Sequence, residues 1–129
     1  MIEILKKIPF FAALSDEDLT AIAKTVTMDY LPQGHTVFKE GDAGDRMYII
    51  KRGQAQVIRG GATLAELNDN DFFGEMALVS DVPRNAEVKI TADTEVMVLK
   101  KEDFVKLITT NPRIAEMVSF EVVKRAGNL

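Results

Sequence analysis

A glycine, a carboxylate and an arginine stand within residues 72–86 at a spacing that suits an anionic ligand. Gly74 precedes Glu75 and a few helix-forming residues, and Arg84 follows nine positions after Glu75. The start of a helical turn behind a glycine leaves backbone N–H groups unshielded, and such groups bind phosphate. The guanidinium of Arg84 is a planar fork of donors that fits a phosphodiester, whereas Glu75 accepts hydrogen bonds from sugar hydroxyls. The pattern therefore describes a pocket for a phosphorylated sugar.

The same three residues also have a purely structural interpretation. Glu75 and Arg84 could form a salt bridge that closes the loop, and Gly74 could serve only a turn. Short motifs of this kind occur often without a ligand, so spacing alone leaves both interpretations open.

The residue counts exclude several other chemistries. The chain contains no cysteine and a single histidine, His35. A disulfide framework, a thiol nucleophile, a thiolate metal site and a multi-histidine metal site are therefore excluded, and no metal or resident cofactor is predicted. His35 follows Gly34 at the start of a predicted strand, so we expect a surface histidine rather than a general base. The lack of cysteine fits the reducing cytoplasm, which is the predicted location.

Length and composition are those of one soluble globular domain. The chain has 129 residues, of which 47% are hydrophobic and 28% charged, and its formal net charge is −4. No basic run stands out, so we expect this chain alone to bind no nucleic acid. No stretch of about 18 apolar residues occurs, which predicts no membrane span. The start of the chain lacks the apolar centre of a signal peptide.

Helical patterns are predicted at both ends of the chain. Ser15 can cap a helix whose first turn, residues 16–18, carries three acidic side chains at the positive end of the helix dipole. Residues 4–11 are apolar but interrupted by Pro9, which predicts a separate helical turn. Near the other end, residues 101–108 form a helix with an apolar face. Asn111 then caps a second helix that begins at Pro112 and runs to about residue 125.

Between the helical ends, short apolar runs alternate with turn clusters every eight to twelve residues or so, which is typical of a β-sandwich or barrel. The candidate strands are residues 35–39, 46–51, 54–59, 63–67, 86–92 and 95–100. The turns between them are rich in glycine, aspartate and asparagine, which tolerate positive φ or bond their own backbone.

The segment from Phe73 to Leu78, with Arg84, Asn85 and Ala86 after it, resembles the phosphate-binding cassette of cyclic-nucleotide-binding domains. This family includes the bacterial catabolite activator, the regulatory subunits of protein kinase A and cyclic-nucleotide-gated channels. Residues 32–34, 38–42 and 47–53 follow the family's glycine frame in order and spacing. The resemblance thus covers nearly the whole chain, and it favours the ligand interpretation over the structural one.

The resemblance implies a fold and a division of the chain. The fold class is α+β: an antiparallel β-barrel or jelly roll of about eight strands, flanked by N-terminal helices and a C-terminal helix pair. Residues 1–129 are expected to form a single domain. Within it, residues 1–28 are the helical start, residues 29–100 the barrel with its cassette at 72–86, and residues 101–127 the hinge and lid helices.

The resemblance also implies the role of individual residues. Arg84 would pair with the cyclic phosphate, and Glu75 would accept the ribose 2′-hydroxyl beside the Gly74 backbone. Backbone N–H groups near Ala77 and Asn85 would complete the phosphate site, and apolar side chains would adjoin the base. The full set of candidate ligand-binding residues is Val57, Ala65, Gly74, Glu75, Met76, Ala77, Arg84, Asn85, Ala86 and Arg125.

The C-terminal helix resembles the lid of bacterial cyclic-nucleotide-regulated potassium channels. In that comparison Arg125 falls where a lid arginine stacks on the base, as a guanidinium on a π-face. Arg125 could equally be a solvated residue near a helix end, where the dipole favours a cation.

The ligand preference rests on one position. Many family members that bind cAMP have alanine or serine after the cassette arginine, and many that bind cGMP have threonine. Here the residue is Asn85, whose amide both donates and accepts hydrogen bonds. The bacterial character of the sequence favours cAMP, with cGMP as the alternative.

The implied function is a regulatory sensor for signal transduction that does no chemistry. Its ligand is a cyclic nucleotide, its lid helix closes over the ligand, and its effector is a domain or protein outside this chain. A cupin-like enzyme would need a cluster of histidine and carboxylate ligands, which one histidine cannot supply. A transcription regulator would need a DNA-reading helix-turn-helix after Leu129. A ligand-free interaction domain of the same fold is disfavoured because Glu75 and Arg84 are intact.

Overall fold

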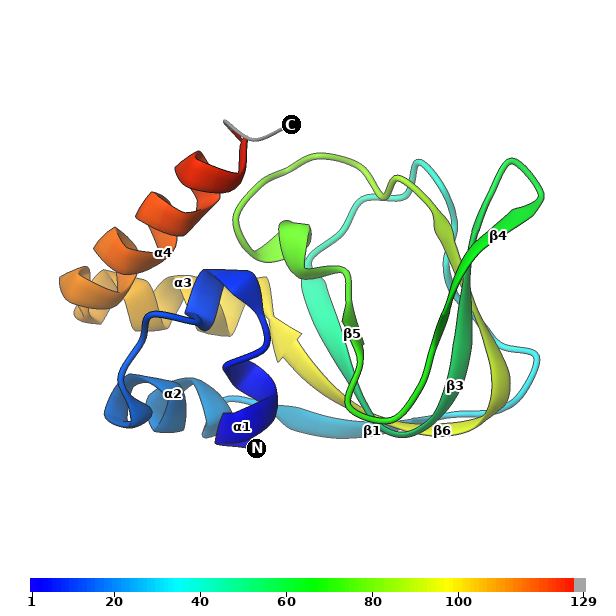
Figure 1. The fold of residues 1–129 in the computed structure, drawn as a ribbon, viewed down its shortest axis with the longest axis horizontal. Coiled ribbons are helices and arrows are strands. Elements are labelled where there is room, and N and C mark those ends of the chain that lie inside the picture. Colours follow the sequence, from blue (N-terminus) through cyan, green and yellow to red (C-terminus); the bar gives the residue numbers. More distant parts are fainter. Residues whose placement is uncertain (127–129) are drawn as a thin grey trace.

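The computed structural model describes residues 1–126, with the side chains of residues 1–119, and divides them into a helical end and a rolled sheet (Figure 1). The helical end holds the first and last elements of the chain. These are α1 (Ile2–Leu5), the 3₁₀ turn η1 (Pro9–Phe11), α2 (Asp16–Ala23), α3 (Lys101–Thr110) and α4 (Pro112–Ala126).

Two long antiparallel strands form the middle of the sheet. β3 (Arg46–Arg59) pairs with β6 (Glu87–Lys100), and the strand order is β1-β6-β3-β4. Both long strands curl, so that one end of the molecule is barrel-like in Figure 1. The other strands are β1 (Thr27–Leu31), β2 (Thr36–Phe38), β4 (Ala62–Leu67) and β5 (Phe72–Phe73), of which β2 adds to β6 and β5 to β3.

The predicted strand count of about eight is not matched, because the described residues form six strands. The pairs predicted at 46–51 with 54–59, and at 86–92 with 95–100, are each one continuous strand. A turn was expected at Gly53, between the predicted strands 46–51 and 54–59. Instead, a Cβ at Gly53 would lie 2.1 Å from Thr94 Oγ1, so the glycine lets β3 pass close to Thr94 of β6. Register shifts between Ile50 and Ala55 absorb the irregularity as bulges.

Local signals predicted the helix starts well. Ser15 Oγ accepts the Asp18 N–H at 3.1 Å and caps α2, and Pro9 begins η1 as a separate turn. Asn111 precedes α4 as predicted, but its side chain does not cap that helix. Asn111 Nδ2 donates to Leu107 O at 2.9 Å, so the amide satisfies the end of α3 while Pro112 begins α4.

The core consists of two apolar clusters, and the cassette touches both. One cluster fills the helical end, where Phe11 and Phe104 pack with ring centroids 5.8 Å apart, and it includes Leu78. The other fills the barrel and includes Phe73 and Ile90. Because Phe73 and Leu78 flank residues 74–77, the core holds the cassette from both sides.

Candidate functional site

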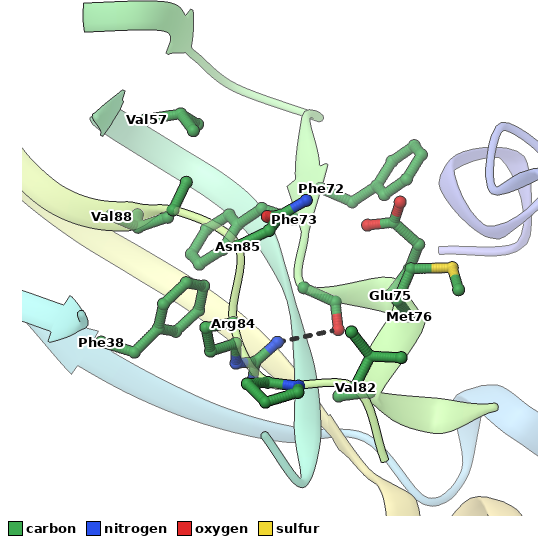
Figure 2. A pocket seen from close by; sticks show the side chains of 14 residues that line it. Phe38, Val57, Phe72, Phe73, Glu75, Met76, Val82, Arg84, Asn85 and Val88 are labelled. Atoms are coloured by element: carbon green, nitrogen blue, oxygen red, sulfur yellow. Dashed lines mark hydrogen bonds between the residues drawn. The ribbon is translucent and has the colours of Figure 1, made fainter. Parts of the chain in front are cut away.

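A cavity of about 360 Å³ lies beside the cassette, at the open side of the barrel (Figure 2). Its wall comes from the ends of β2, β3, β5 and β6, from the 3₁₀ turn η2 (Glu75–Leu78) and from the loop before β6. The lining residues are Phe38, Val57, Phe72, Phe73, Gly74, Glu75, Met76, Ala77, Val82, Pro83, Arg84, Asn85, Ala86 and Val88.

Gly74 makes the turn that starts η2. Its φ of 77° lies in the left-handed region, where a Cβ is unfavourable. A Cβ at Gly74 would also lie 2.6 Å from Arg84 Nη1, so the glycine gives the guanidinium room. The turn is shorter than a regular α-helix, and the Ala77 N–H already donates to Gly74 O at 3.2 Å. Ala77 therefore offers less to an anion than the resemblance implied.

Arg84 is the buried charged group of the site, with only 9% of its surface exposed. Its Nη1 donates to Gly74 O at 3.1 Å and its Nη2 donates to Arg46 O at 2.7 Å. The guanidinium carbon lies 4.1 Å from the centroid of the Phe38 ring, a cation–π contact visible in Figure 2. These contacts hold the guanidinium in one orientation before any ligand arrives.

The Nε of Arg84 is buried and has no hydrogen-bond partner among the described residues. Burial lowers the pKa of the Arg84 guanidinium from its ordinary value, opposed by the nearby acidic groups of Tyr48, Asp45 and Glu75. An arginine nonetheless stays protonated at neutral pH. The site therefore holds a permanent positive charge that water screens weakly, which favours an anion in the adjoining cavity.

The loop before β3 supports Arg84 from behind. The Arg84 N–H donates to Asp42 O, and the Gly41 N–H donates to Arg84 O, both at 2.7 Å. A Cβ at Gly44 would lie 2.6 Å from Arg84 Nε. Sequence reasoning treated this loop as a plain turn. The glycine at 44 was the available signal that the backbone approaches another group closely.

The salt bridge considered from the sequence is absent. Among residues 1–119, Glu75 forms no ion pair with Arg84. Glu75 lies half-buried at the first position of η2 and lines the cavity, so its carboxylate is available for a hydroxyl group. The structural interpretation of the motif is therefore wrong for this pair.

Eight of the ten candidate residues line the cavity, and they lie on three separate elements. Ala65 does not. It lies across from Val57 on β4, one strand farther from the cassette, and it is exposed. The side chain of Arg125 lies outside the described residues.

Sequence reasoning named Val57 and Met76 among the lining residues but missed Phe38, Phe73 and Val82. Phe38 and Phe73 line the cavity with ring centroids 6.0 Å apart, and Tyr48, which does not line it, stacks on Phe73 at 5.0 Å. Met76 and Val82, 48% and 63% exposed, stand at the mouth. Exposed apolar side chains beside a buried cation suit a ligand with one flat apolar end and one anionic end.

The comparison with protein families decides the assignment. A family model described as the cyclic nucleotide-binding domain matches residues 28–111, which include the cassette and most of the sheet. This chain belongs to the cyclic nucleotide-binding domain family. The resemblance inferred from the cassette is confirmed.

Individual relatives of the domain agree with this assignment. A cAMP-dependent protein kinase regulatory subunit of Eremothecium gossypii is 36% identical over 107 residues, which are 82% of this chain and 23% of the relative. The cGMP-dependent protein kinase egl-4 of Caenorhabditis briggsae is 37% identical over 115 residues, 84% of this chain and 15% of the relative. The chain therefore spans less than a quarter of the length of these relatives.

A solved structure confirms the jelly-roll class. The N-terminal domain of a transcriptional regulator from Streptomyces coelicolor superimposes with a TM-score of 0.87 at 27% identity, over 97% of this chain and 91% of that domain. Two negative findings apply to the described residues of this domain. No helix among them is long and apolar enough to cross a membrane, and no group of three or more metal-binding side chains occurs.

Proposed function

We propose that this domain binds a cyclic nucleotide, preferably cAMP, in the cavity beside η2, and acts as a regulatory sensor without a catalytic step of its own. The observation that carries the proposal is the buried guanidinium of Arg84, held by backbone carbonyls and an aromatic face in the wall of the cavity. A buried cation of this kind favours an anion strongly, because water screens it weakly.

Each part of the cavity then has a role in holding the nucleotide. Arg84 and the free backbone N–H groups beside it bind the cyclic phosphate, and Glu75 accepts the ribose hydroxyl next to Gly74. Met76, Val57 and Val82 contact the base. Polar and apolar side chains both line the cavity, as a nucleotide requires.

The choice between cAMP and cGMP centres on Asn85. Relatives named for either nucleotide are about equally similar to this chain, so similarity does not separate them. The exposed Asn85 amide at the cavity can donate to or accept from a purine edge. We propose cAMP as the ligand, with cGMP as the alternative.

We further propose that α4 acts as a lid that closes when the ligand binds. No side chain from residues 101–119 lines the cavity, so α4 lies off the ligand site as far as residue 119. A second cavity of about 370 Å³ lies among η2, α3 and α4, and its lining includes the half-buried apolar side chains of Val79, Ile108 and Ala115. Movement of α4 into that space would bury more apolar surface, which gives the closed state a driving force.

The output of such a movement would go to a domain or protein outside this chain, and residues 1–129 would respond as one module. The relatives are several times longer than this chain, which supports an effector in the wider protein. The cytoplasmic location expected from the lack of cysteine remains a prediction.

Isothermal titration with cAMP and cGMP tests the proposal. We expect both to bind, cAMP more tightly, and Arg84→Ala to weaken binding about 100-fold because the phosphate loses a charged donor. Arg84→Lys keeps the charge but loses the planar fork of donors, so its affinity should lie between those of the wild type and Arg84→Ala. Arg52→Ala, an exposed arginine outside the cavity, is the matched control. Absence of heat and of a thermal shift at millimolar nucleotide would contradict the proposal.

A further inference from the structure

Arg59 reaches the ligand site from outside the cavity. It is the last residue of β3, is exposed, and does not line the cavity. Its Nε donates to Asn85 O at 2.9 Å, although the two residues are 26 positions apart. The backbone pairing of β3 with β6 ends at Ile58 and Glu87. The side chain of Arg59 therefore continues the connection one step beyond the ladder, onto the residue that follows Arg84.

This contact completes the restraint of one short stretch of backbone. The Arg84 N–H donates to residue 42, and the Arg84 carbonyl accepts from residue 41. The Asn85 carbonyl accepts from Arg59. The N–H groups of Asn85 and Ala86 have no partner among the described residues. Both residues line the cavity. The free donors are thus the two N–H groups that follow Arg84. The N–H and carbonyl of Arg84 and the carbonyl of Asn85, on the same stretch of backbone, are all hydrogen-bonded.

The planar peptide links Arg59 to one of these free donors. In a trans peptide the carbonyl of residue 85 and the N–H of residue 86 point in opposite directions. By holding Asn85 O, Arg59 therefore directs the Ala86 N–H away from itself. Without this restraint the peptide could rotate and turn the carbonyl of residue 85 toward the anion.

We propose that Arg59 is a positioning residue of the anion site, which acts through Asn85 to keep the backbone donors after Arg84 directed at the cyclic phosphate. The inference deepens the proposed function and rests on it. Because the phosphate is common to all cyclic nucleotides, Arg59 should affect cAMP and cGMP by the same factor. A residue that acted on the base would change their ratio instead.

The variants Arg59→Ala, Arg59→Lys and Arg52→Ala separate positioning from a general effect. Arg52 lies on the same strand, is exposed, and contacts neither the cavity nor Asn85, so it controls for the loss of one surface charge. We expect Arg59→Ala to raise the Kd of both nucleotides about fivefold, as for one charged hydrogen bond in partial contact with water. Arg59→Lys can still donate to Asn85 O and should stay within about twofold of the wild type.

Thermal denaturation of the ligand-free variants provides the second measurement. If Arg59 only stabilised the end of β3, its loss would lower the melting temperature and leave the Kd of the folded protein unchanged. An unchanged Kd, or a change for one nucleotide only, would overturn the inference while the wild type still binds. If the wild type binds neither nucleotide, the proposed function itself fails, and the inference fails with it.

Discussion

Gly44 determines where the buried guanidinium of Arg84 can lie. Its backbone φ is not in the left-handed region, so glycine is not needed there for conformation. Glycine is needed for space, because a Cβ would lie 2.6 Å from Arg84 Nε and 2.7 Å from Cζ. The position of the Arg84 guanidinium therefore depends on the absence of a side chain at residue 44.

Gly44→Ala should displace Arg84 and weaken cyclic-nucleotide binding about tenfold, because a misplaced donor loses most of a charged hydrogen bond. Calorimetric titration measures the change. Gly34→Ala is the control, since a Cβ at Gly34 meets no atom within 4 Å. Its positive φ of 91° should cost about 1 kcal/mol of stability and leave the Kd unchanged. Equal affinities for both variants would show that Gly44 does not position Arg84.

At the scale of elements, an ion pair connects the two ends of the chain. Arg113 in the first turn of α4 lies 2.5 Å from Asp18 in α2, 95 positions away. The Asp18 side chain is 9% exposed, whereas that of Arg113 is 68% exposed. Asp18 was predicted from the sequence only as part of the α2 start. Its carboxylate also joins α4 to the N-terminal helices.

Arg113→Ala should lower the free energy of unfolding by about 1 to 2 kcal/mol, because it leaves a buried carboxylate without its partner. Urea denaturation measures the loss. Lys106→Ala removes an exposed pair with Glu102 on α3 and should cost less than about 0.5 kcal/mol. A loss for Arg113→Ala no larger than that of the control would mean that water compensates Asp18.

The helices were easier to predict from the sequence than the strands, for a physical reason. Helix starts depend on local signals, such as Ser15 and Pro9, and these are visible in the sequence. Strand limits depend on partners. β1 is almost wholly exposed and shows no alternation of buried and exposed residues. β5 has only two residues, which form a strand because they pair with β3. A turn was expected at Gly53 because glycine is typical of turns. In the structure this glycine leaves room for Thr94, which is 41 positions away in the sequence.

The site divides in the same way. The cassette residues could be predicted because they are contiguous and chemically distinctive. Phe38 and the carbonyl of Arg46, which hold Arg84, could not, because a ring face and a backbone oxygen leave no spacing pattern. Arg59 was missed because its effect passes through a neighbour, Asn85.

At the scale of the whole molecule, an acidic protein is proposed to bind an anion. The net charge of −4 repels a cyclic phosphate at long range, so steering by the overall field is weak or adverse. Attraction must arise locally, at Arg84 and the backbone donors beside it. Salt screens charges in water over about 8 to 10 Å at ordinary ionic strength, but it screens buried charges much less.

The affinity for cAMP should therefore depend only weakly on salt. Between low and high ionic strength, about 0.05 and 0.5 M, we expect the Kd to change less than about threefold, because the weakened repulsion and the barely screened attraction act in opposite directions. Titrations at several salt concentrations measure the slope. A loss of affinity of about tenfold would mean that exposed cations hold the phosphate, and it would remove Arg84 from the centre of the site. Arg84→Lys should raise the slope, since an ammonium in place of the fork holds the phosphate less directly and leaves it more open to water.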